Sequence, residues 1–270
     1  MTVRTIDVRG RAVEIIEAGD GPALVYLHDI ADIHAARPDL LPFHQSLAQD
    51  FHIIAPAHPG CASSEENDDI DVIEDVVFHI VEVLDALSLE TFHLVGAGVG
   101  GWIAAEFAVR HPERLVRLAL LGATGLYVSD QPIGDIFMAV QSVDGGMYPD
   151  FRSMLFRDAS HSEALALFPD GLGNLENEML RYKMFRFLSR IGFRPPYLYN
   201  RTLRDRLYRC DCPALVLWGS EDRLVPTTHA TVYGDELGDA RVEILPDAGH
   251  SFWIEQPDNA AALMRKFFLD

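Results

Sequence analysis

The chain has 270 residues, of which 49% are hydrophobic, and this is enough to bury the core of one sizeable globular domain. Its 41 acidic and 22 basic residues give a net charge of −19, which argues against nucleic acid as a partner because nucleic-acid binders present a basic patch. No apolar run reaches the ~18 residues that a membrane span needs, and three cysteines do not make a disulfide framework. We therefore expect a cytoplasmic protein that binds neither nucleic acid nor membrane.

The first half of the chain reads as strands alternating with helices. Residues 3–8 and 11–18 predict two strands, and the short apolar runs 23–27 and 51–55 are typical of strands buried on both faces of a parallel sheet. A helix is predicted over about 37–49. A second helix follows an acidic stretch, because its apolar residues recur with a 3.6-residue period. These residues stand at positions 73, 76, 77, 80, 84 and 87.

A glycine-rich turn lies between the strand predicted over 91–95 and a helix predicted over about 100–110. Gly96 and Gly100 frame the turn, with Gly98 between them. A strand, a tight turn and a helix in this order resemble the nucleophile elbow, G-x-S-x-G, of the α/β-hydrolase family. The central position of that motif carries the attacking serine. Gly98 has no side chain, so the resemblance implies a hydrolase fold whose nucleophile position is vacant.

The second half of the chain returns to the strand–helix pattern after a long interruption. Strands are predicted over 115–121, 214–218 and 241–245, and a closing helix over 259–269. Residues 124–209, between the second-half strands predicted over 115–121 and 214–218, consist of short helical pieces rich in aromatic residues and methionine. This composition predicts an inserted helical cap. We predict a doubly wound, mostly parallel α/β sheet, with an α/β-hydrolase core over 1–123 and 210–270.

Two later loops extend the resemblance to most of the chain. Residues 217–226 are similar to the family's acid loop, and residues 248–257 are similar to its histidine loop. Position 98, Asp222 and His250 keep the family's order of nucleophile, acid and histidine. The resemblance implies that Asp222 orients His250 and that His250 moves the proton.

The loop after residue 27 departs from the family pattern. His28 is followed by Asp29, where the family usually continues with glycine. The resemblance places one oxyanion donor here, the N–H of Asp29 or Ile30, and the other at the N–H of Val99. In a dry pocket Asp29 would tend to hold a proton and could act as an acid. Alternatively, its side chain points outward as an ordinary turn residue.

Other candidates surround this constellation. Cys61 is intrinsically nucleophilic and would have to reach His250 to replace the serine. His28, Trp102 and Trp253 are candidate pocket walls. Cys210 and Cys212 have no further ligand nearby in the sequence, so we expect no metal, and no motif predicts a cofactor.

Two main hypotheses about function follow. In the first, the protein is a hydrolase or lyase-type enzyme that acts on a small apolar ester, lactone or carbonyl substrate. The His250–Asp222 dyad is its general base and deprotonates a substrate group or a water in the space above Gly98. In the second, it is an inactive ligand-binding or scaffold protein. An engineered serine-to-glycine replacement also stays open, as does a homodimer. If the rest of the site persists, Gly98→Ser is predicted to raise esterase activity without further change.

Overall fold

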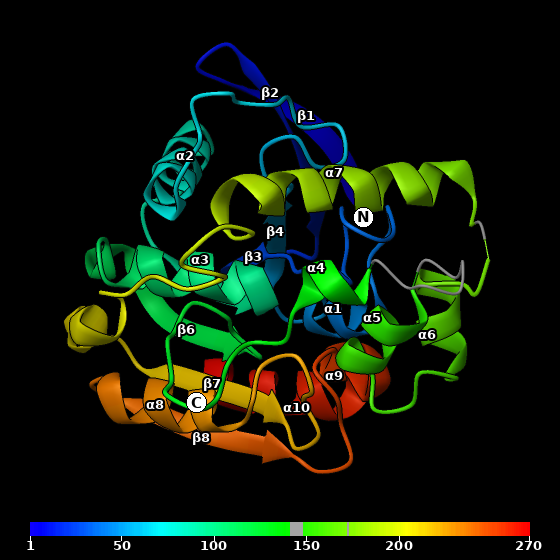
Figure 1. Ribbon diagram of the computed structural model, residues 1–270. Helices are drawn as coiled ribbons and strands as arrows, with labels where there is room; N and C mark the ends of the chain where they lie inside the picture. Colours follow the sequence, from blue (N-terminus) through cyan, green and yellow to red (C-terminus); the bar gives the residue numbers. More distant parts are fainter. Residues whose placement is uncertain (141–147, 172) are drawn as a thin grey trace.

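The computed structural model describes residues 1–140, 148–171 and 173–270, and its centre is an eight-stranded sheet (Figure 1). The strand order is β1-β2-β4-β3-β5-β6-β7-β8, in which β1, β2 and β4 pair antiparallel and all later neighbours pair parallel. The strands are β1 (Thr2–Val8), β2 (Arg11–Ala18), β3 (Ala23–Leu27), β4 (His52–Pro56), β5 (Phe92–Ala97), β6 (Leu115–Leu121), β7 (Ala214–Gly219) and β8 (Ala240–Leu245). The predicted α/β fold with a mostly parallel sheet is confirmed.

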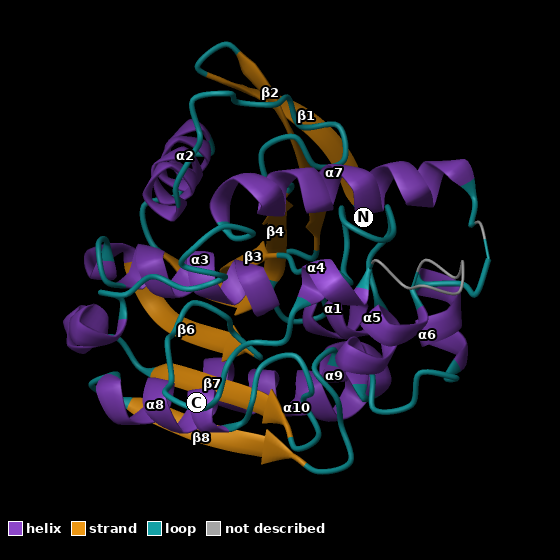
Figure 2. Cartoon of the chain, viewed as in Figure 1, coloured by secondary structure: helices purple, strands orange, loops and turns teal. Residues whose placement is uncertain are grey.

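Helices lie in front of and behind the strands (Figure 2). One group consists of α1, α9 and α10, which pack on one another. The other consists of α2, α3, the short helix η2 (Arg204–Arg209) and α8, each of which contacts the next along the sheet. The described helices outside residues 124–209 are α1 (Pro42–Leu47), α2 (Ile73–Ala86), α3 (Gly98–Ala108), η1 (Pro112–Arg114), α8 (Thr228–Glu236), α9 (Phe252–Glu255) and α10 (Pro257–Leu269). The helix predicted over 37–49 is shorter than expected because it begins at Pro42, whose missing N–H suits a first helical turn.

The middle of the sheet contains a topological switch point, because β3 lies between β4 on one side and β5 on the other. In open α/β sheets, ligands bind outside the carboxyl ends of the strands at such a point. The register pairs Leu27 at the end of β3 with Gly96 in β5. The residues two positions further along, Asp29 and Gly98, therefore leave the sheet side by side.

The turn between β5 and α3 is as tight as its glycines predict. A Cβ on Gly96 would lie 2.3 Å from the Gly100 carbonyl oxygen, and a Cβ on Gly100 would lie 2.1 Å from that of Leu27. Helix α3 begins at Gly98, two residues before the predicted start. Its first N–H groups therefore point to the space above the end of β5.

Residues 124–209 lie between β6 and β7, and none of their described residues belongs to a named strand of the sheet. Their helices are α4 (Ile136–Ala139), α5 (Pro149–Leu155), α6 (Ser162–Leu167), α7 (Leu175–Ile191) and η2 (Arg204–Arg209); residues 141–147 and 172 lie outside the described part. The division into core and cap stays a prediction. Among the described helices, none has the length and apolarity that a membrane crossing requires.

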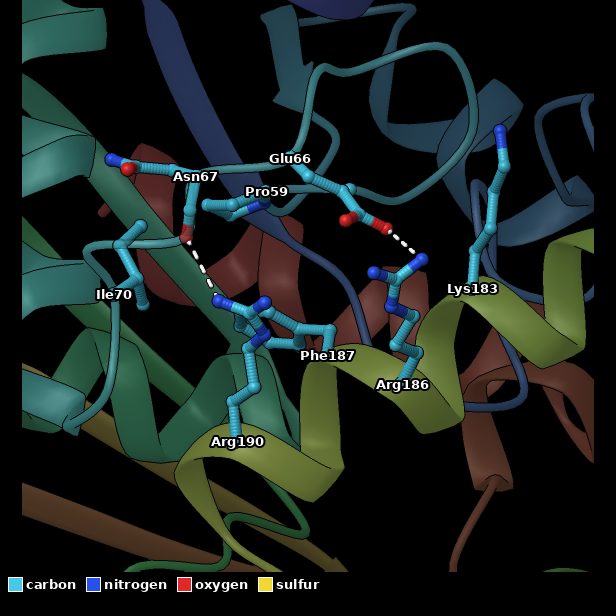
Figure 3. A pocket seen from close by; sticks show the side chains of 9 residues that line it. Pro59, Glu66, Asn67, Ile70, Lys183, Arg186, Phe187 and Arg190 are labelled. Atoms are coloured by element: carbon cyan, nitrogen blue, oxygen red, sulfur yellow. Dashed lines mark hydrogen bonds and ion pairs between the residues drawn. The ribbon is translucent and has the colours of Figure 1, made fainter.

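Helix α7 is attached to the loop that follows β4 (Figure 3). Arg186 pairs with Glu66 at 2.5 Å, and Arg190 donates a hydrogen bond to the Asn67 carbonyl oxygen at 3.2 Å. One turn earlier on the helix, Lys183 donates to the Ala62 carbonyl oxygen. Three cations on one side of α7 thus hold this helix against a loop at the carboxyl edge of the sheet.

Candidate active site

Asp222 and His250 come together as their loops leave neighbouring strands. The loop after β7 carries Asp222 and the loop after β8 carries His250, and Oδ2 of Asp222 lies 2.8 Å from Nδ1 of His250. The other carboxylate oxygen of Asp222 accepts the N–H groups of Leu224 and Val225, at 2.9 and 2.7 Å. These bonds fix the carboxylate, so that it can hold the imidazole in one orientation. The predicted hydrogen bond is present, and the catalytic roles of both residues stay predictions.

Asp29 points into the site and is fully buried. Its Oδ1 accepts the Val99 N–H at 3.0 Å, and its Oδ2 lies 3.5 Å from Nε2 of His250. The alternative that this side chain points outward is therefore wrong. The adjacent β3–β5 register is the physical reason, because it directs residue 29 over the elbow turn.

The space above Gly98 is filled by the Asp29 carboxylate. Gly98 has a φ of +49°, and a Cβ built on it would lie 2.0 Å from Oδ1 and 2.7 Å from Oδ2 of Asp29. Two expectations from the sequence are corrected here. Nε2 of His250 faces a carboxylate and not a water-filled gap, and Gly98→Ser cannot place a hydroxyl beside His250 unless Asp29 moves.

The imidazole of His250 lies between two carboxylates. Burial by itself lowers the pKa of His250, but the charge and hydrogen bond of Asp222, together with the nearby carboxylate of Asp29, outweigh it and raise the pKa to about 10. His250 is thus an imidazolium at neutral pH, with one ring nitrogen directed at each carboxylate. The Asp29 carboxyl group accepts the Val99 N–H and faces this imidazolium, and its role as an acid stays a prediction.

His28 holds the Asp29 loop in place through both of its ring nitrogens. Nδ1 lies 3.1 Å from the Asp29 carbonyl oxygen, and Nε2 accepts the His58 N–H at 3.1 Å. The His58 ring stacks on His28 with centroids 3.9 Å apart and on Phe187 of α7 at 5.0 Å. Burial lowers the pKa of His28, and it lowers the pKa of His58 to about 4, so both rings are neutral. Sequence reasoning missed this support, although His28 and His58 each follow a buried strand.

The two tryptophans proposed as pocket walls lie in different places. The Trp253 ring packs edge-on against the His250 ring, with centroids 5.9 Å apart. Trp102 instead donates a hydrogen bond to Glu106 at 3.2 Å and lines a cavity with Ile73, Ile191 and residues of the segment that follows α7. Trp253 is therefore the one in contact with the dyad. Lining a substrate pocket stays a prediction for both residues.

The remaining candidates are buried side chains or backbone groups. Sγ of Cys61 lies 3.7 Å from Sδ of Met184, and burial raises the pKa of this thiol. A thiol held protonated is a poor nucleophile, so the structure gives Cys61 no support as a replacement for serine. The Val99 N–H is present at the elbow but donates to Asp29. Ile30 is buried, and its role as an oxyanion donor stays a prediction.

Comparisons with known proteins agree with this architecture. The family described as alpha/beta hydrolase fold matches residues 22–257. The chain is 29% identical to 2-hydroxymuconate semialdehyde hydrolase of Pseudomonas sp. (strain CF600), over 99% of this chain and 94% of the relative. It is 25% identical to monoacylglycerol lipase abhd6-B of Xenopus laevis, over 92% and 76%.

A solved structure is similar over the whole chain. The 2-hydroxy-6-oxo-6-phenylhexa-2,4-dienoate hydrolase from Rhodococcus sp. strain RHA1 superposes with a TM-score of 0.77 at 24% identity, and the match covers 100% of both chains. At this identity the likeness concerns the fold alone.

Proposed function

The chain belongs to the α/β-hydrolase fold family, and we propose that it is a hydrolase of this family that works without a covalent serine intermediate. Family membership and the hydrolase relatives support hydrolase activity. The proposed substrates are small apolar esters, lactones or carbonyl compounds, with His250 as general base and Asp222 as the group that orients it. The 2.8 Å hydrogen bond between these two residues beside the elbow turn carries the proposal.

The protonation of His250 sets the conditions under which this base can work. A base must have lost its proton before it can accept one from water. Because the pKa of His250 is raised to about 10, the neutral form is scarce at pH 7 and increases about tenfold with each unit of pH. General base catalysis contributes about 10²–10⁴-fold, which suffices for activated esters and not for amides.

His250→Ala is expected to remove ester hydrolysis, because this change removes the imidazole that is the proposed general base beside the elbow turn. Turnover of p-nitrophenyl acetate at pH 9 should fall by about 10²-fold or more. Cys61→Ala is the control, since Cys61 contacts Met184 and not the dyad, and it should retain the wild-type rate. Equal rates in wild type and His250→Ala would exclude His250 as the base.

Asp29→Asn is expected to make the protein a better base catalyst at neutral pH. Asp29 is one of the two carboxylates that raise the pKa of His250, so removing its charge lowers that pKa toward the ordinary value of about 6.5. The rising limb of the pH–rate profile for p-nitrophenyl acetate should move to lower pH, and the imidazole titration followed by NMR should move with it. An unchanged profile would show that Asp29 and His250 are not coupled.

A binding protein is the second candidate function, and one observation favours it. The Asp29 carboxylate takes the Val99 N–H that an oxyanion would need, and Asp29 and His250 are both fully buried. The ester assay separates the two functions. If wild-type turnover equals that of His250→Ala from pH 6 to pH 10, the protein is better described as a binder on a hydrolase fold.

A further inference from the structure

We propose that two copies of this chain pair through their β8 strands, with Val242 at the two-fold axis, and so form one continuous sheet. The partner that this surface fits is thus a second copy of the chain. The inference goes beyond the proposed ester hydrolysis and does not depend on it.

Strand β8 (Ala240–Leu245) ends the sheet with one side unpaired. In the part of the chain that the structure describes, β8 pairs with β7 alone. It lies at the lower margin of the molecule in Figure 1, with no helix or strand beyond it in that view. An edge strand of this kind presents a row of unpaired N–H and C=O groups, which is a template for another strand.

The hydrogen bonds at the two ends of β8 show which of its main-chain groups are unpaired. The Ala214 N–H donates to the Asp239 carbonyl oxygen at 2.8 Å. At the other end, the Ser220 N–H donates to the Leu245 carbonyl oxygen at 2.8 Å. Because the carbonyl groups of a strand point alternately to its two sides, the odd-numbered residues of β8 bond to β7. The N–H and C=O groups of Val242 and its even-numbered neighbours therefore point out of the sheet.

An antiparallel pair with its two-fold axis at Val242 uses all of these outward groups. Val242 then lies opposite Val242 of the second copy, and Ala240 lies opposite Ile244. Opposed residues of this hydrogen-bonded kind exchange both of their N–H···O bonds. The contact uses the same surface on both copies, as the closed symmetry of a dimer requires.

The charges of β8 are self-complementary in this register. A Cβ on Gly234 of α8 would lie 2.3 Å from Cγ2 of Val242, so Val242 points toward α8. Arg241 and Glu243 point to the opposite face of the sheet, because side chains alternate along a strand. Within one chain, Nε of Arg241 donates to Oε1 of Glu243 at 2.7 Å. In the pair Arg241 also lies opposite Glu243 of the second copy, so that cations and anions alternate around the axis.

The same charges exclude the neighbouring registers. A shift of the axis by one residue puts Arg241 opposite Arg241 or Glu243 opposite Glu243, and like charges directly opposite each other are destabilising. Strand β1, at the other edge of the sheet, has no comparable register. Its charged residues Arg4 and Asp7 point to opposite faces, so a two-fold axis perpendicular to the sheet cannot bring them together.

Apolar side chains add to the contact on the face that carries α8. Val242 and Ile244 are 39% and 43% exposed in the single chain. In the pair Val242 packs on Val242 of the second copy, and Ile244 packs beside Ala240. Cross-strand pairs of β-branched residues stabilise a sheet, so the pairing removes this apolar surface from water with a gain in free energy.

The pairing leaves each candidate active site within one chain. Antiparallel β8 strands direct the carboxyl ends of the two sheets in opposite directions, so the two Asp222–His250 pairs lie at opposite ends of the dimer. Ester turnover and association are measured separately. The inference and the proposed function can therefore each fail without the other.

Sedimentation velocity in ~0.15 M NaCl tests the pairing, since salt at this concentration screens the repulsion between chains of net charge −19 beyond about 8 Å. Over about 1–100 μM chain, a dissociation constant in the micromolar range gives a mass that rises from the 30.1 kDa of one chain toward twice that value. The mass of one chain at every concentration would overturn the proposal.

Charge reversal identifies the surface, with each variant checked for folding by circular dichroism. Arg241→Glu puts acids opposite acids and should raise the dissociation constant of the dimer about tenfold or more. The exchange Arg241→Glu/Glu243→Arg restores opposite charges in the same register and should restore the dimer. A dimer that Arg241→Glu does not weaken, or that the exchange does not restore, would overturn the proposal.

Arg4→Glu is the matched control. It makes the same change of net charge on the other edge strand, where Arg4 also pairs with a glutamate of its own chain, Glu17, at 2.6 Å. This variant should associate like the wild type. If Arg4→Glu weakens the dimer as much as Arg241→Glu does, net charge alone controls association and the β8 pairing is wrong.

Amide hydrogen exchange resolved to single residues gives a second readout. The Val242 N–H points out of the sheet, so it should exchange slowly in the wild-type dimer and rapidly in Arg241→Glu. The Glu243 N–H points toward β7 and should be protected in both proteins. If the Val242 N–H exchanges at the same rate in both, the two copies do not meet along β8.

Discussion

We expect Gly98→Ser alone to leave ester hydrolysis unchanged, and the double variant Asp29→Gly/Gly98→Ser to raise it by about 10³-fold or more. In the single variant the new Cβ would lie 2.0 Å from Oδ1 of Asp29, so the two side chains compete for one volume. In the double variant the Asp29→Gly change removes the carboxylate from that volume. It also frees the Val99 N–H and removes one of the two charges that raise the pKa of His250.

Steady-state kinetics with p-nitrophenyl acetate measures this gain, and an initial burst of p-nitrophenol should mark a covalent acyl-enzyme in the double variant only. Asp29→Gly is the matched control, since it separates the effect of an open site from that of the new hydroxyl. A serine at a φ of +49° costs about 1–3 kcal/mol of strain, so the double variant should melt earlier but remain folded. Equal activity in Asp29→Gly and the double variant would show that the elbow does not support serine chemistry.

Gly100→Ala is expected to have the largest effect on stability, with the free energy of unfolding lowered by about 3 kcal/mol or more. Its Cβ would lie 2.1 Å from the Leu27 carbonyl oxygen and 2.5 Å from the carbonyl carbon. These are backbone atoms of a buried strand and cannot rotate away. Within a helix, alanine is worth about 1 kcal/mol more than glycine, which is too little to offset the overlap.

Thermal unfolding followed by circular dichroism measures the change. Gly171→Ala is the control, because a Cβ there meets nothing within 4 Å, and its free energy of unfolding should stay within about 0.5 kcal/mol of wild type. If Gly100→Ala melts at the wild-type temperature, β3 and α3 are not packed as closely as the structure shows.

The fold was predictable because its signals are local. The apolar runs at 23–27 and 115–121 became β3 and β6, and the glycines at 96 and 100 marked the turn between β5 and α3. The loops with Asp222 and His250 could be placed at the same edge of the sheet, because each follows a strand in a parallel arrangement. Their hydrogen bond was a consequence of that placement.

The direction of the Asp29 side chain was not predictable in this way. It depends on the pairing of Leu27 with Gly96, and no periodicity within either strand encodes a register between strands. The stack of His28, His58 and Phe187 joins three distant segments and escaped prediction for the same reason. Asp29 adds to the rise in the pKa of His250 that Asp222 causes, and this contribution could not be foreseen because it depends on the same register.

The overlap between Asp29 and position 98 also imposes an order on mutational change. A substitution that brings serine to position 98 first meets an occupied volume and gains nothing, whereas a change of Asp29 to glycine first opens the volume and lowers the pKa of His250. Only when Asp29 changes before position 98 is each of the two substitutions expected to raise activity. The aspartate is therefore a steric barrier: while it stays in place, a substitution at position 98 alone cannot create serine chemistry.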